Sequence, residues 1–549
     1  MKRLGLLVVA LLFLTACAHA PVTPAVPNSP AATMRALQSA VAGTKIKHIV
    51  FIIQENRTFD SIFGGKDPFS GADAVSYGYS HDGNKIKLTE VPLEKPSCPI
   101  GWFSCADPNN YHPQWLLACN APNPPPFPVG QPAPCRMNGF DLNAKPQKGF
   151  PVPVGVDDSV IYSYVNRTEV QPYWDLANYY ALGDHFFMGH NSESYTAHQY
   201  LFMGQSHNTV DAPQFDLPNL GGGYCDAYYV YCAYTPWGCD SPSGTKMYTI
   251  DANGAEVPTP PKFPKSGPAP CFGGSGYTSL AEAAQSKGLS WRVYLWSMCS
   301  GIDALDANSN IRHNADLWPQ NISMQNCHLR YGPASTGDVN TKHFRTPSNE
   351  FFDDELPYAG HPGRSLASIT WIMPGPYNSD HPGISGGYCG PTWVASIVDA
   401  IGSKPDWDST VIFILWDDWG GFYDHVPPYV VRDQQGPGFR VPLIVVSPYI
   451  KRAGIIVKTP TEFATLLKFA ETTFNLPSLN ATDTTPYLND LDAYFDFTHP
   501  PYKFTNITAP YTTRCYWSAH GNIAGRKERA PGPGSDQSRW LRIINDVAD

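Results

Sequence analysis

Five short apolar runs constrain the fold of this 549-residue chain more than any other feature. The runs are rich in Val, Ile, Phe, Trp and Tyr, and they cover residues 46–53, 291–296, 368–373, 411–416 and 441–446. Because nearly every position in them is apolar, they predict strands that are buried on both faces. Such strands occur in parallel sheets that are covered by helices.

Three predicted helices alternate with these runs. The residues SLAE at 279–282 form a capping-box pattern, and Gly288 is expected to end the helix that they open. Residues 392–401 predict a second helix. A third is predicted at 463–474, where TPTE at 459–462 places Thr at the N-cap, Pro at N1 and Glu at N3. This alternation predicts an α/β layered fold.

The overall charge argues against a nucleic-acid partner. The chain has 38 Lys and Arg against 48 Asp and Glu, whereas a nucleic-acid surface needs a basic stripe to neutralise phosphates. Gly and Pro are abundant, at 46 and 54 residues, which indicates long ordered loops over a compact scaffold. We expect the chemistry to lie on such loops.

Residues 1–17 resemble a bacterial lipoprotein signal peptide. They have a basic start, an apolar stretch too short to span a bilayer, and the sequence LTAC at the end. We expect a lipid on Cys17 that anchors the chain to a membrane, followed by a Pro-rich tether at 18–44. The expected location is the periplasm or the outer membrane. An ordinary signal peptide cut near 18–20, and hence a secreted protein, is the alternative.

The cysteines predict disulfide bonds. Of the 13, Cys17 would carry the lipid, and the other 12 form an even number in Pro-rich and Gly-rich segments of an exported chain. A zinc site is the competing interpretation, but no two cysteines stand as Cys-x-x-Cys, and the pairing cannot be read from the sequence. Four of them lie in a predicted insertion at about 210–276, which is either a lid or a surface binding module.

Two polar motifs directly follow predicted strands, QENRTFD at 54–60 and DDWGGFYDH at 417–425. In open parallel sheets, ligands collect beyond the carboxyl ends of the strands. Adjacent acids such as Asp417 and Asp418 repel each other unless a cation or solvent lies between them, so the pair indicates either a metal site or an exposed loop. The glycines at 420–421 favour a site, because glycine lets the backbone approach a ligand closely.

Four segments carry a resemblance to a known family. They follow the family's order over most of residues 45–480, and they are 48–60 (HIVFIIQENRTFD), 184–205, 417–428 and 441–448 (VPLIVVSP). They resemble the bacterial phosphoesterase family of non-haemolytic phospholipases C and acid phosphatases, within the alkaline-phosphatase-like superfamily. The resemblance implies an α/β/α sandwich with a mostly parallel central sheet, disulfide-bearing loop insertions and one catalytic domain at 45–549.

The resemblance also implies one bound divalent metal ion. Carried over by motif, its ligands would be Glu55 and Asn56 from the first motif, Asp417 and Asp418 from the second, and Ser194. These hard oxygen ligands suit Ca²⁺, Mg²⁺ or Mn²⁺, and Zn²⁺ is not excluded. Many members have Asp-Glu where this chain has Asp-Asp, and the departure favours the acid-phosphatase branch.

The same resemblance places the nucleophile in the segment GHNSESYTAHQYL at 189–201. Anchoring the segment on the Ala-His pair that ends at His198 assigns the nucleophile to Ser194, with Ser192 as the alternative. Glu193 departs from the family's usual Gly or Pro. His198 itself is interpreted as part of the scaffold.

Three histidines are implied as active-site residues that bind phosphate oxygens and protonate the leaving oxygen. By position they are His381, which matches best, His313, which follows Arg312 where the family often has a second His, and His112. For His425 we rank a structural role ahead of catalysis.

The implied reaction is the hydrolysis of a phosphate ester through a phosphoserine, in which the metal activates the serine. Because the text after about residue 480 is short, we expect an acid-phosphatase-like phosphomonoesterase, with a phospholipase C acting on lipid head groups as the alternative. A non-catalytic surface lipoprotein is the second alternative. A sulfatase is disfavoured because the Cys/Ser-x-Pro-x-Arg context is absent around Ser194.

Overall fold

The computed structural model describes the chain between residues 42 and 508, with gaps. The described residues are 42–93, 106–147, 152–214, 238–239, 241, 246–258, 271–296, 298, 303–319, 339–346, 348–356, 363–375, 378–382 and 389–508. The predicted signal peptide, Cys17 and nearly all of the tether lie outside these residues, as does most of the predicted insertion at 210–276. Those expectations therefore stay predictions.

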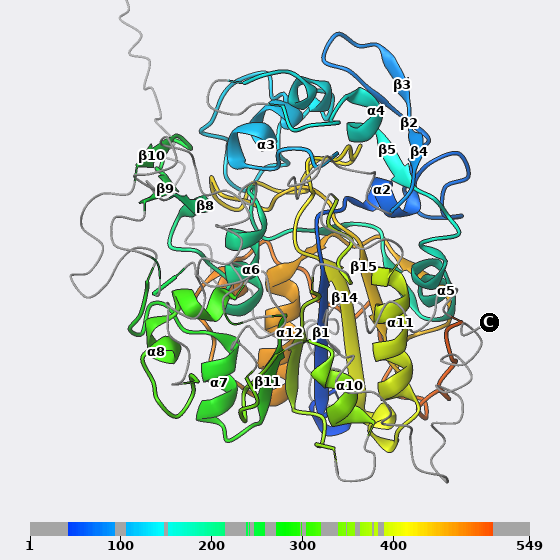
Figure 1. Ribbon diagram of the computed structural model, residues 1–549, viewed down its shortest axis with the longest axis vertical. Coiled ribbons are helices and arrows are strands. Elements are labelled where there is room, and N and C mark those ends of the chain that lie inside the picture. Colours follow the sequence, from blue (N-terminus) through cyan, green and yellow to red (C-terminus); the bar gives the residue numbers. More distant parts are fainter. Residues whose placement is uncertain are drawn as a thin grey trace, which may run out of the picture.

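The centre of the molecule is an eight-stranded sheet (Figure 1). In spatial order its strands are β12 (Phe344–Arg345), β11 (Trp291–Tyr294), β13 (Ile369–Ile372), β1 (His48–Gln54), β14 (Thr410–Trp416), β15 (Leu443–Val446), β6 (Ala181–Gly183) and β16 (Ile455–Val457). Strand β1 pairs in parallel with both β13 and β14, and every residue of β14 is buried. The predicted mostly parallel sheet is therefore confirmed.

All five apolar runs form strands, but one of them runs against the others. The run at 441–446 forms β15, which pairs antiparallel with β14 and with β6, so the expectation of a parallel strand there was wrong. Burial on both faces produces the same apolar pattern in either direction, so the pattern could not reveal the reversal. The chain that leaves β14 turns back at the same edge of the sheet, and an antiparallel neighbour needs no crossover.

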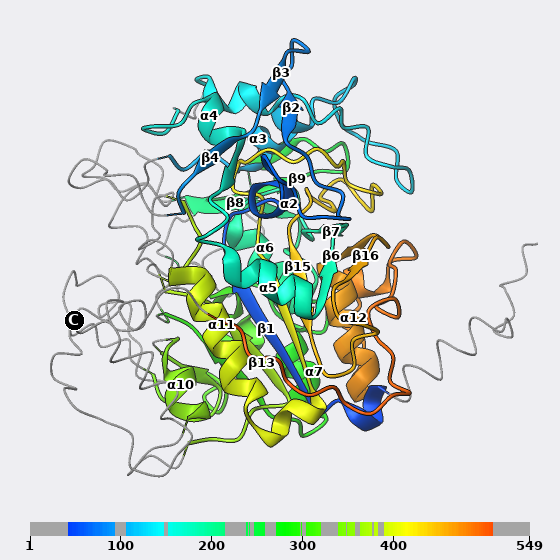
Figure 2. The same cartoon turned by 90° about the vertical axis from the view of Figure 1, so that its right-hand side faces the viewer.

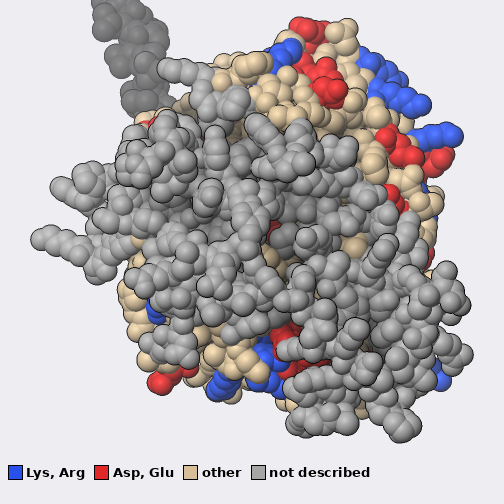
Figure 3. All heavy atoms as spheres, in the orientation of Figure 1, with Lys and Arg blue, Asp and Glu red and all other residues tan. Residues whose placement is uncertain are grey.

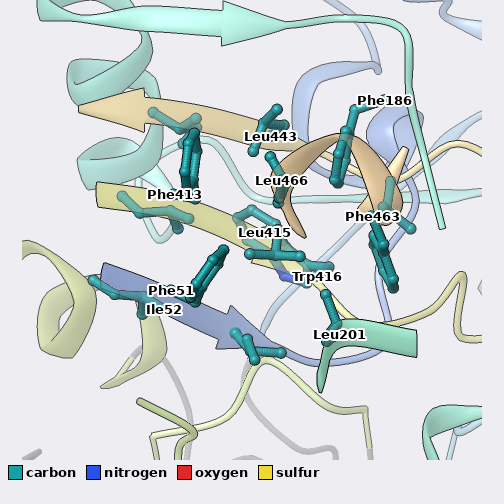
Figure 4. Close-up of a cluster of buried hydrophobic side chains, with 14 of the residues drawn as sticks. Phe51, Ile52, Phe186, Leu201, Phe413, Leu415, Trp416, Leu443, Phe463 and Leu466 are labelled. Atoms are coloured by element: carbon teal, nitrogen blue, oxygen red, sulfur yellow. The ribbon is translucent and has the colours of Figure 1, made fainter. Parts of the chain in front are cut away.

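Helices cover both faces of the sheet, which gives the predicted α/β/α sandwich (Figure 2). One face carries α5 (Gln171–Tyr179), α10 (Glu350–Glu355) and α11 (Cys389–Gly402). The other carries α6 (Ser194–Met203), α7 (Leu280–Ser286) and α12 (Phe463–Phe474). Figure 4 shows α6 and α12 packing on the sheet, where Leu201, Phe463 and Leu466 face buried residues of β1 and β14.

All three predicted helices form, but only one of the three predicted starts agrees with the structure. The capping box between Ser279 and Glu282 opens α7, and residues 392–401 lie inside α11. The predicted N-cap at 459 was wrong, because α12 begins after Glu462, whose backbone and side chain cap the helix. The preceding pair Thr461–Glu462 is drawn into strand β17, which pairs with β7 (Phe186–Phe187).

Loops and short elements form a cap beyond the carboxyl ends of the parallel strands (Figure 1). It contains α2 (Phe59–Phe63), α3 (His112–Cys119), α4 (Asp158–Ile161), β2 (Tyr77–Tyr79), β3 (Lys85–Lys87), β4 (Thr89–Val91), β5 (Ser163–Val165), β8 (Thr209–Gln214), β9 (Lys246–Ile250) and β10 (Glu256–Pro258). Elsewhere lie α8 (Ser309–Arg312) and the 3₁₀ helices Phe140–Ala144, Ala304–Ala307, Pro405–Ser409 and Thr482–Thr484.

Between pairs of described residues, disulfides join Cys119, the last residue of α3, to Cys135 in the following loop, and Cys239 to Cys271. They confirm the prediction that the loops carry disulfide bonds. Within the described ranges, no helix combines the length and the apolar character that a membrane crossing requires. On the face shown in Figure 3, basic and acidic side chains of the described residues are interspersed along the upper right edge.

Candidate metal centre and nucleophile

The two polar motifs meet because the strands before them are neighbours in register. Gln54 at the end of β1 pairs with Trp416 at the end of β14. The backbone N–H of Asn56 then donates to Asp417 Oδ1 at 3.0 Å, across a sequence separation of 361 residues. The parallel ladder therefore places both motifs at one edge of the sheet.

The backbone at this junction needs unusual conformations. Asn56 has a φ of 55°, in the left-handed region. Gly420 has a φ of 60°, and a Cβ added there would lie 2.3 Å from the carbonyl oxygen of Asn56. The close backbone approach that the glycine pair indicated in the sequence is therefore present, and it presses one motif against the other.

Ser194 points its hydroxyl into this junction. Its Oγ lies 2.8 Å from Asp418 Oδ2 and 3.1 Å from Asn56 Oδ1, so the hydroxyl can donate to either oxygen. Ser194 is the first residue of α6, and Glu193 caps that helix. Glu193 accepts from the Tyr195 N–H at this terminus, and the dipole of a helix N-terminus attracts anions such as a phosphoryl group.

Ser192, the alternative nucleophile, is occupied elsewhere. Its Oγ donates to Asp211 Oδ1 at 2.7 Å and accepts from the backbone N–H of Asp211 at 2.9 Å. The residue is fully buried, whereas Ser194 is partly exposed. These contacts favour Ser194 as the reactive serine.

A histidine joins the predicted ligands. Atoms of Glu55, His198 and Asp417 that can bind a metal lie within 4.8 Å of one another, and all three residues are buried. The distance from His198 Nε2 to Asp417 Oδ2 is 3.3 Å. The sequence analysis interpreted His198 as scaffold, although its position one helical turn after Ser194 could have signalled that both side chains share one face of α6.

The carboxylates of the junction strongly perturb each other. Burial and the charges of Asp417 and Asp418 raise the pKa of Glu55 well above its ordinary value. Burial and the charge of Asp417 raise the pKa of Asp418 well above its ordinary value in the same way. Burial also acts on Asp417, but the facing His198 and the hydrogen bond from the backbone N–H of Asn56 outweigh it and lower the pKa of that carboxyl.

The donor set fits a divalent cation. Among the contacts of the described residues, Asp417 Oδ2 and His198 Nε2 are buried without a hydrogen-bond partner, although they face each other. Three neighbouring carboxylates in a buried site carry negative charge that a metal ion would offset. Carboxylate and amide oxygens with one imidazole suit Mg²⁺, Mn²⁺ or Zn²⁺.

His381 reaches the junction from the loop after β13. Its Nε2 lies 3.2 Å from Asn56 Nδ2, and its Nδ1 lies 2.7 Å from the carbonyl oxygen of Pro382. With the proton on Nδ1, the ring donates to that carbonyl and accepts from Asn56. The structure thus brings His381 together with the predicted ligands.

The ring of His112 faces Asn191, which lies three residues before Ser194. Its Nδ1 lies 3.1 Å from both Asn191 O and Asn191 Oδ1. Burial lowers the pKa of His112 to about 4, so the ring is neutral near pH 7 and a poor proton donor. A catalytic role for His112 stays a prediction.

The other two histidines lie in other surroundings. His313 is exposed at the C-cap of α8, beside the Cys239–Cys271 disulfide. Its contacts in the described part of the chain do not include the predicted ligands, and its catalytic role also stays a prediction. His425 lies 2.6 Å from Asp60, in a separate ionic cluster that fits the structural role ranked first for it.

The sequence analysis did not single out Asn110, which the structure brings to the junction. Its Nδ2 lies 2.9 Å from Asp418 Oδ1 and 3.0 Å from Asp418 Oδ2. The residue belongs to a polar loop of the cap, where no apolar pattern or motif marked it. Only the folded chain reveals its partner.

Among known proteins, the chain is similar to phospholipases C at low sequence identity. The chain is 27% identical over 273 residues to the non-hemolytic phospholipase C of Burkholderia pseudomallei, which covers 41% of this chain and 37% of the relative. It is 22% identical over 503 residues to phospholipase C A of Mycobacterium tuberculosis, covering 85% of this chain and 79% of the relative. The crystal structure of Ps i-CgsB matches with a TM-score of 0.31 at 12% identity, covering 58% of this chain and 70% of that one.

The family comparison covers most of the chain. Residues 46–477 match the model of the Phosphoesterase family. That range includes both strand-end motifs, Ser194 and His381. Together with the phospholipase C relatives, the match supports a phosphoric ester hydrolase. The chain belongs to the Phosphoesterase family.

Proposed function

We propose that the protein hydrolyses phosphate esters with Ser194 as the nucleophile. The observation that carries this proposal is the position of the Ser194 hydroxyl, 2.8 Å from Asp418 and 3.1 Å from Asn56, beside the buried cluster of Glu55, His198 and Asp417. A nucleophile, acidic ligands and a helix N-terminus at one point form a phosphoryl-transfer site.

The metal would be held by Glu55, Asn56, Asp417 and Asp418, with His198 as a further donor. When bound, a divalent cation withdraws charge from the phosphoryl oxygens and from the attacking oxygen. The residues of the chain position the reacting groups. Asp418 fixes the direction of the Ser194 hydroxyl, and Asn56 lies between that hydroxyl and His381.

The reaction has two balanced steps. In the first, Ser194 Oγ loses its proton and forms a bond to phosphorus, and the bond from phosphorus to the alcohol breaks as that alcohol takes up a proton. In the second, water attacks phosphorus and breaks the bond to Ser194, which regains its proton. We assign the exchange of protons with the leaving oxygen to His381, because its ring lies beside Asn56 at the junction.

The substrate class rests on two opposing arguments. The Asp-Asp pair at 417–418, where many family members have Asp-Glu, favours a phosphomonoesterase. The relatives named phospholipase C favour a phosphodiester of a lipid head group. We place the phospholipid diester first and the monoester second, because the M. tuberculosis relative aligns over 85% of this chain.

Two serine variants test the nucleophile. We expect Ser194→Ala to lose activity on a chromogenic phosphate ester by a factor on the order of 10⁴, because a missing nucleophile removes the covalent path. Ser192→Ala is the matched control, and it should keep most of the activity. The assignment is wrong if the two results are exchanged. If wild-type protein neither hydrolyses esters nor binds metal, the non-catalytic lipoprotein becomes the better reading.

A substrate panel separates the two ester classes. Purified protein is assayed side by side with p-nitrophenyl phosphate, bis-p-nitrophenyl phosphate and vesicles of phosphatidylcholine. The phospholipase C proposal expects release of phosphocholine from the vesicles at a higher kcat/KM than phosphate from the monoester. The opposite order would restore the phosphomonoesterase.

We also infer export and lipid attachment at Cys17, on the strength of the LTAC sequence. Cells that express the full chain are fed a labelled fatty acid. The label should enter the wild-type protein and the membrane fraction, whereas Cys17→Ala should be unlabelled. A labelled Cys17→Ala protein would contradict the inference.

A further inference from the structure

Asn110 contacts the acidic pair from outside both motifs. Its amide nitrogen faces the two oxygens of Asp418, at 2.9 Å and 3.0 Å. Its own carbonyl oxygen accepts a hydrogen bond from Trp419 Nε1 at 3.1 Å. The side chain and the backbone of Asn110 are thus both tied to the segment that carries the two acids.

Asp418 is oriented by donors from three parts of the chain. Besides Asn110, they are Ser194 Oγ at 2.8 Å and the backbone N–H of Gly420 at 2.6 Å. The Asp418 side chain is fully buried, so each oxygen depends on protein donors to hold its direction. Removing the Asn110 donor would leave Asp418 with only the Ser194 hydroxyl and the Gly420 N–H to hold its direction.

The side-chain amide of Asn110 donates to Asp418 without carrying a charge. A Lys or Arg at this position would orient the carboxylate equally well, but its charge would neutralise Asp418 and compete with a metal ion. The amide of Asn110 fixes the geometry and leaves the negative charge in place. Such outer partners hold metal-ligating carboxylates in many sites.

We propose that Asn110 is a positioning residue that holds Asp418 towards Ser194 and the metal site. The inference rests on the proposed function, since it assigns Asn110 a task in that same site. It predicts that metal affinity and the rate of the chemical step both depend on a residue that need not contact the substrate.

The test compares three variants of the full-length protein. Asn110→Ala removes the donor, and Asn110→Asp replaces the amide nitrogen with an oxygen of nearly the same size that cannot donate when ionised. Asn138→Ala is the matched control, because Asn138 lies in the same cap, is partly buried and accepts a hydrogen bond from Asn120. Each variant is titrated with Mn²⁺ and with Zn²⁺ by calorimetry.

We expect Asn110→Ala to bind the metal about 10- to 100-fold more weakly than wild type. At saturating metal its kcat should fall by a similar factor, while KM for p-nitrophenyl phosphate stays within about twofold. Asn110→Asp should lose more activity than Asn110→Ala, because it adds a like charge beside Asp418. Asn138→Ala should match wild type in both measurements.

Three results would overturn the proposal. The first is metal affinity and kcat in Asn110→Ala equal to those of Asn138→Ala. The second is a melting temperature of metal-free Asn110→Ala so low that the variant is partly unfolded under the assay conditions, in proportion to its losses of metal affinity and kcat. That result would make the residue merely structural. The third is wild-type protein that binds neither ion and hydrolyses nothing, a result that removes the proposed function as well and so is distinguishable from the other two.

Discussion

Among the described residues, two clusters of acidic residues differ in how their charge is balanced. The first is the metal-site cluster of Glu55, Asp417 and Asp418, with His198 beside it. The second, which we call the ionic cluster, contains Asp60, Asp73, Asp184, Asp424, His185, His425, Arg440 and Lys458. Both follow strand ends, and Asp60 and Asp424 belong to the same two motifs as the metal-site acids.

The ionic cluster holds its own cations. Arg440 is fully buried and lies 3.0 Å from Asp424 and 3.3 Å from Asp60. Lys458 pairs with Asp184 at 2.8 Å. Arg440 also donates to the backbone carbonyls of Asp73 and Asp184, and so joins the cap to the sheet.

Two histidines complete the balance of the ionic cluster. His425 lies between Asp60 at 2.6 Å and Asp73 at 3.0 Å, one from each ring nitrogen. His185 lies in the same way between Asp184 at 2.9 Å and Asp73 at 3.4 Å. A ring nitrogen that faces a carboxylate is satisfied when it carries a proton. Each ring thus bridges two carboxylates of the ionic cluster.

The comparison shows that spacing alone does not identify a metal site. Asp60, Asp424 and His425 also have atoms close enough together to bind an ion, yet Arg440 already supplies the positive charge there. In the metal-site cluster, Asp418 accepts hydrogen bonds from a hydroxyl, an amide and a backbone N–H, which are neutral donors. The unbalanced cluster is therefore the one that calls for a cation.

Removal of the metal should produce the largest effect. We expect exhaustive dialysis against a chelator to lower the hydrolysis of a chromogenic phosphate ester by a factor on the order of a thousand. The ion supplies several kcal/mol of transition-state stabilisation, and about 1.4 kcal/mol corresponds to tenfold. Activity should return on adding Mn²⁺ or Zn²⁺. Full activity in metal-free protein would contradict the argument that the metal-site cluster, unlike the ionic cluster, needs a cation.

The same titration can be followed by thermal unfolding. A divalent ion at 100 times its dissociation constant should stabilise the wild-type fold by about 2.7 kcal/mol. In Glu55→Gln the stabilisation should shrink, because one ligand charge is missing. An equal rise in melting temperature in the two proteins would place the ion somewhere other than this cluster.

Loss of the buried arginine should be the next largest effect. Arg440→Met leaves Asp60 and Asp424 buried without their cation, so we expect the free energy of unfolding to fall by about 3 to 5 kcal/mol. Urea unfolding at pH 7 measures it. Lys458→Met is the matched control, because the Lys458 side chain is 59% exposed and its pair with Asp184 should contribute at most about 1 kcal/mol. Equal losses in the two variants would contradict the charge-balance argument.

The pH dependence of the ionic cluster should be a smaller effect. Burial opposes the charge of His425, but Asp60 and Asp424 outweigh burial and the repulsion of Arg440, so the pKa of His425 is raised to about 9. Because the folded pKa lies above the unfolded value of about 6.5, the contribution is fully present below pH 6.5 and is lost as pH rises through about 9.

The measurement is the difference in unfolding free energy between wild type and His425→Gln from pH 6 to pH 10. We expect that difference to decrease by about 2 kcal/mol over this range, after allowance for partial exposure of the ring. Asp73 faces the same ring and belongs to the balance, so Asp73→Asn should reduce the pH dependence as well. A difference that is independent of pH would show that His425 is not protonated in the fold.

The central strands and the meeting of the two polar motifs could be predicted from the sequence. Continuous apolar runs located the central strands, and because β1 and β14 are parallel neighbours, the polar residues after them had to meet. The convergence of Glu55 with Asp417 and of Ser194 with Asp418 therefore followed from local patterns combined with one resemblance. The α/β/α sandwich followed in the same way.

Other features depended on contacts that no local pattern records. The reversal of β15 left no trace in its apolar run, and the start of α12 moved because Thr461 and Glu462 pair with β7. His198 lies one turn from Ser194 on a helix that is buried almost throughout, so its polar role was hidden among packed residues. Asn110 acquired its partner only through the folding of the cap.

The register of β1 against β14 has a consequence for how the protein matures. The first ligand-bearing motif leaves the ribosome some 361 residues before its partner, as the contact between Asn56 and Asp417 shows. No short fragment can assemble the ion-binding constellation, since a chain that stops before β14 lacks half of it. Binding of an ion at this site would therefore require that the two distant segments have already folded together.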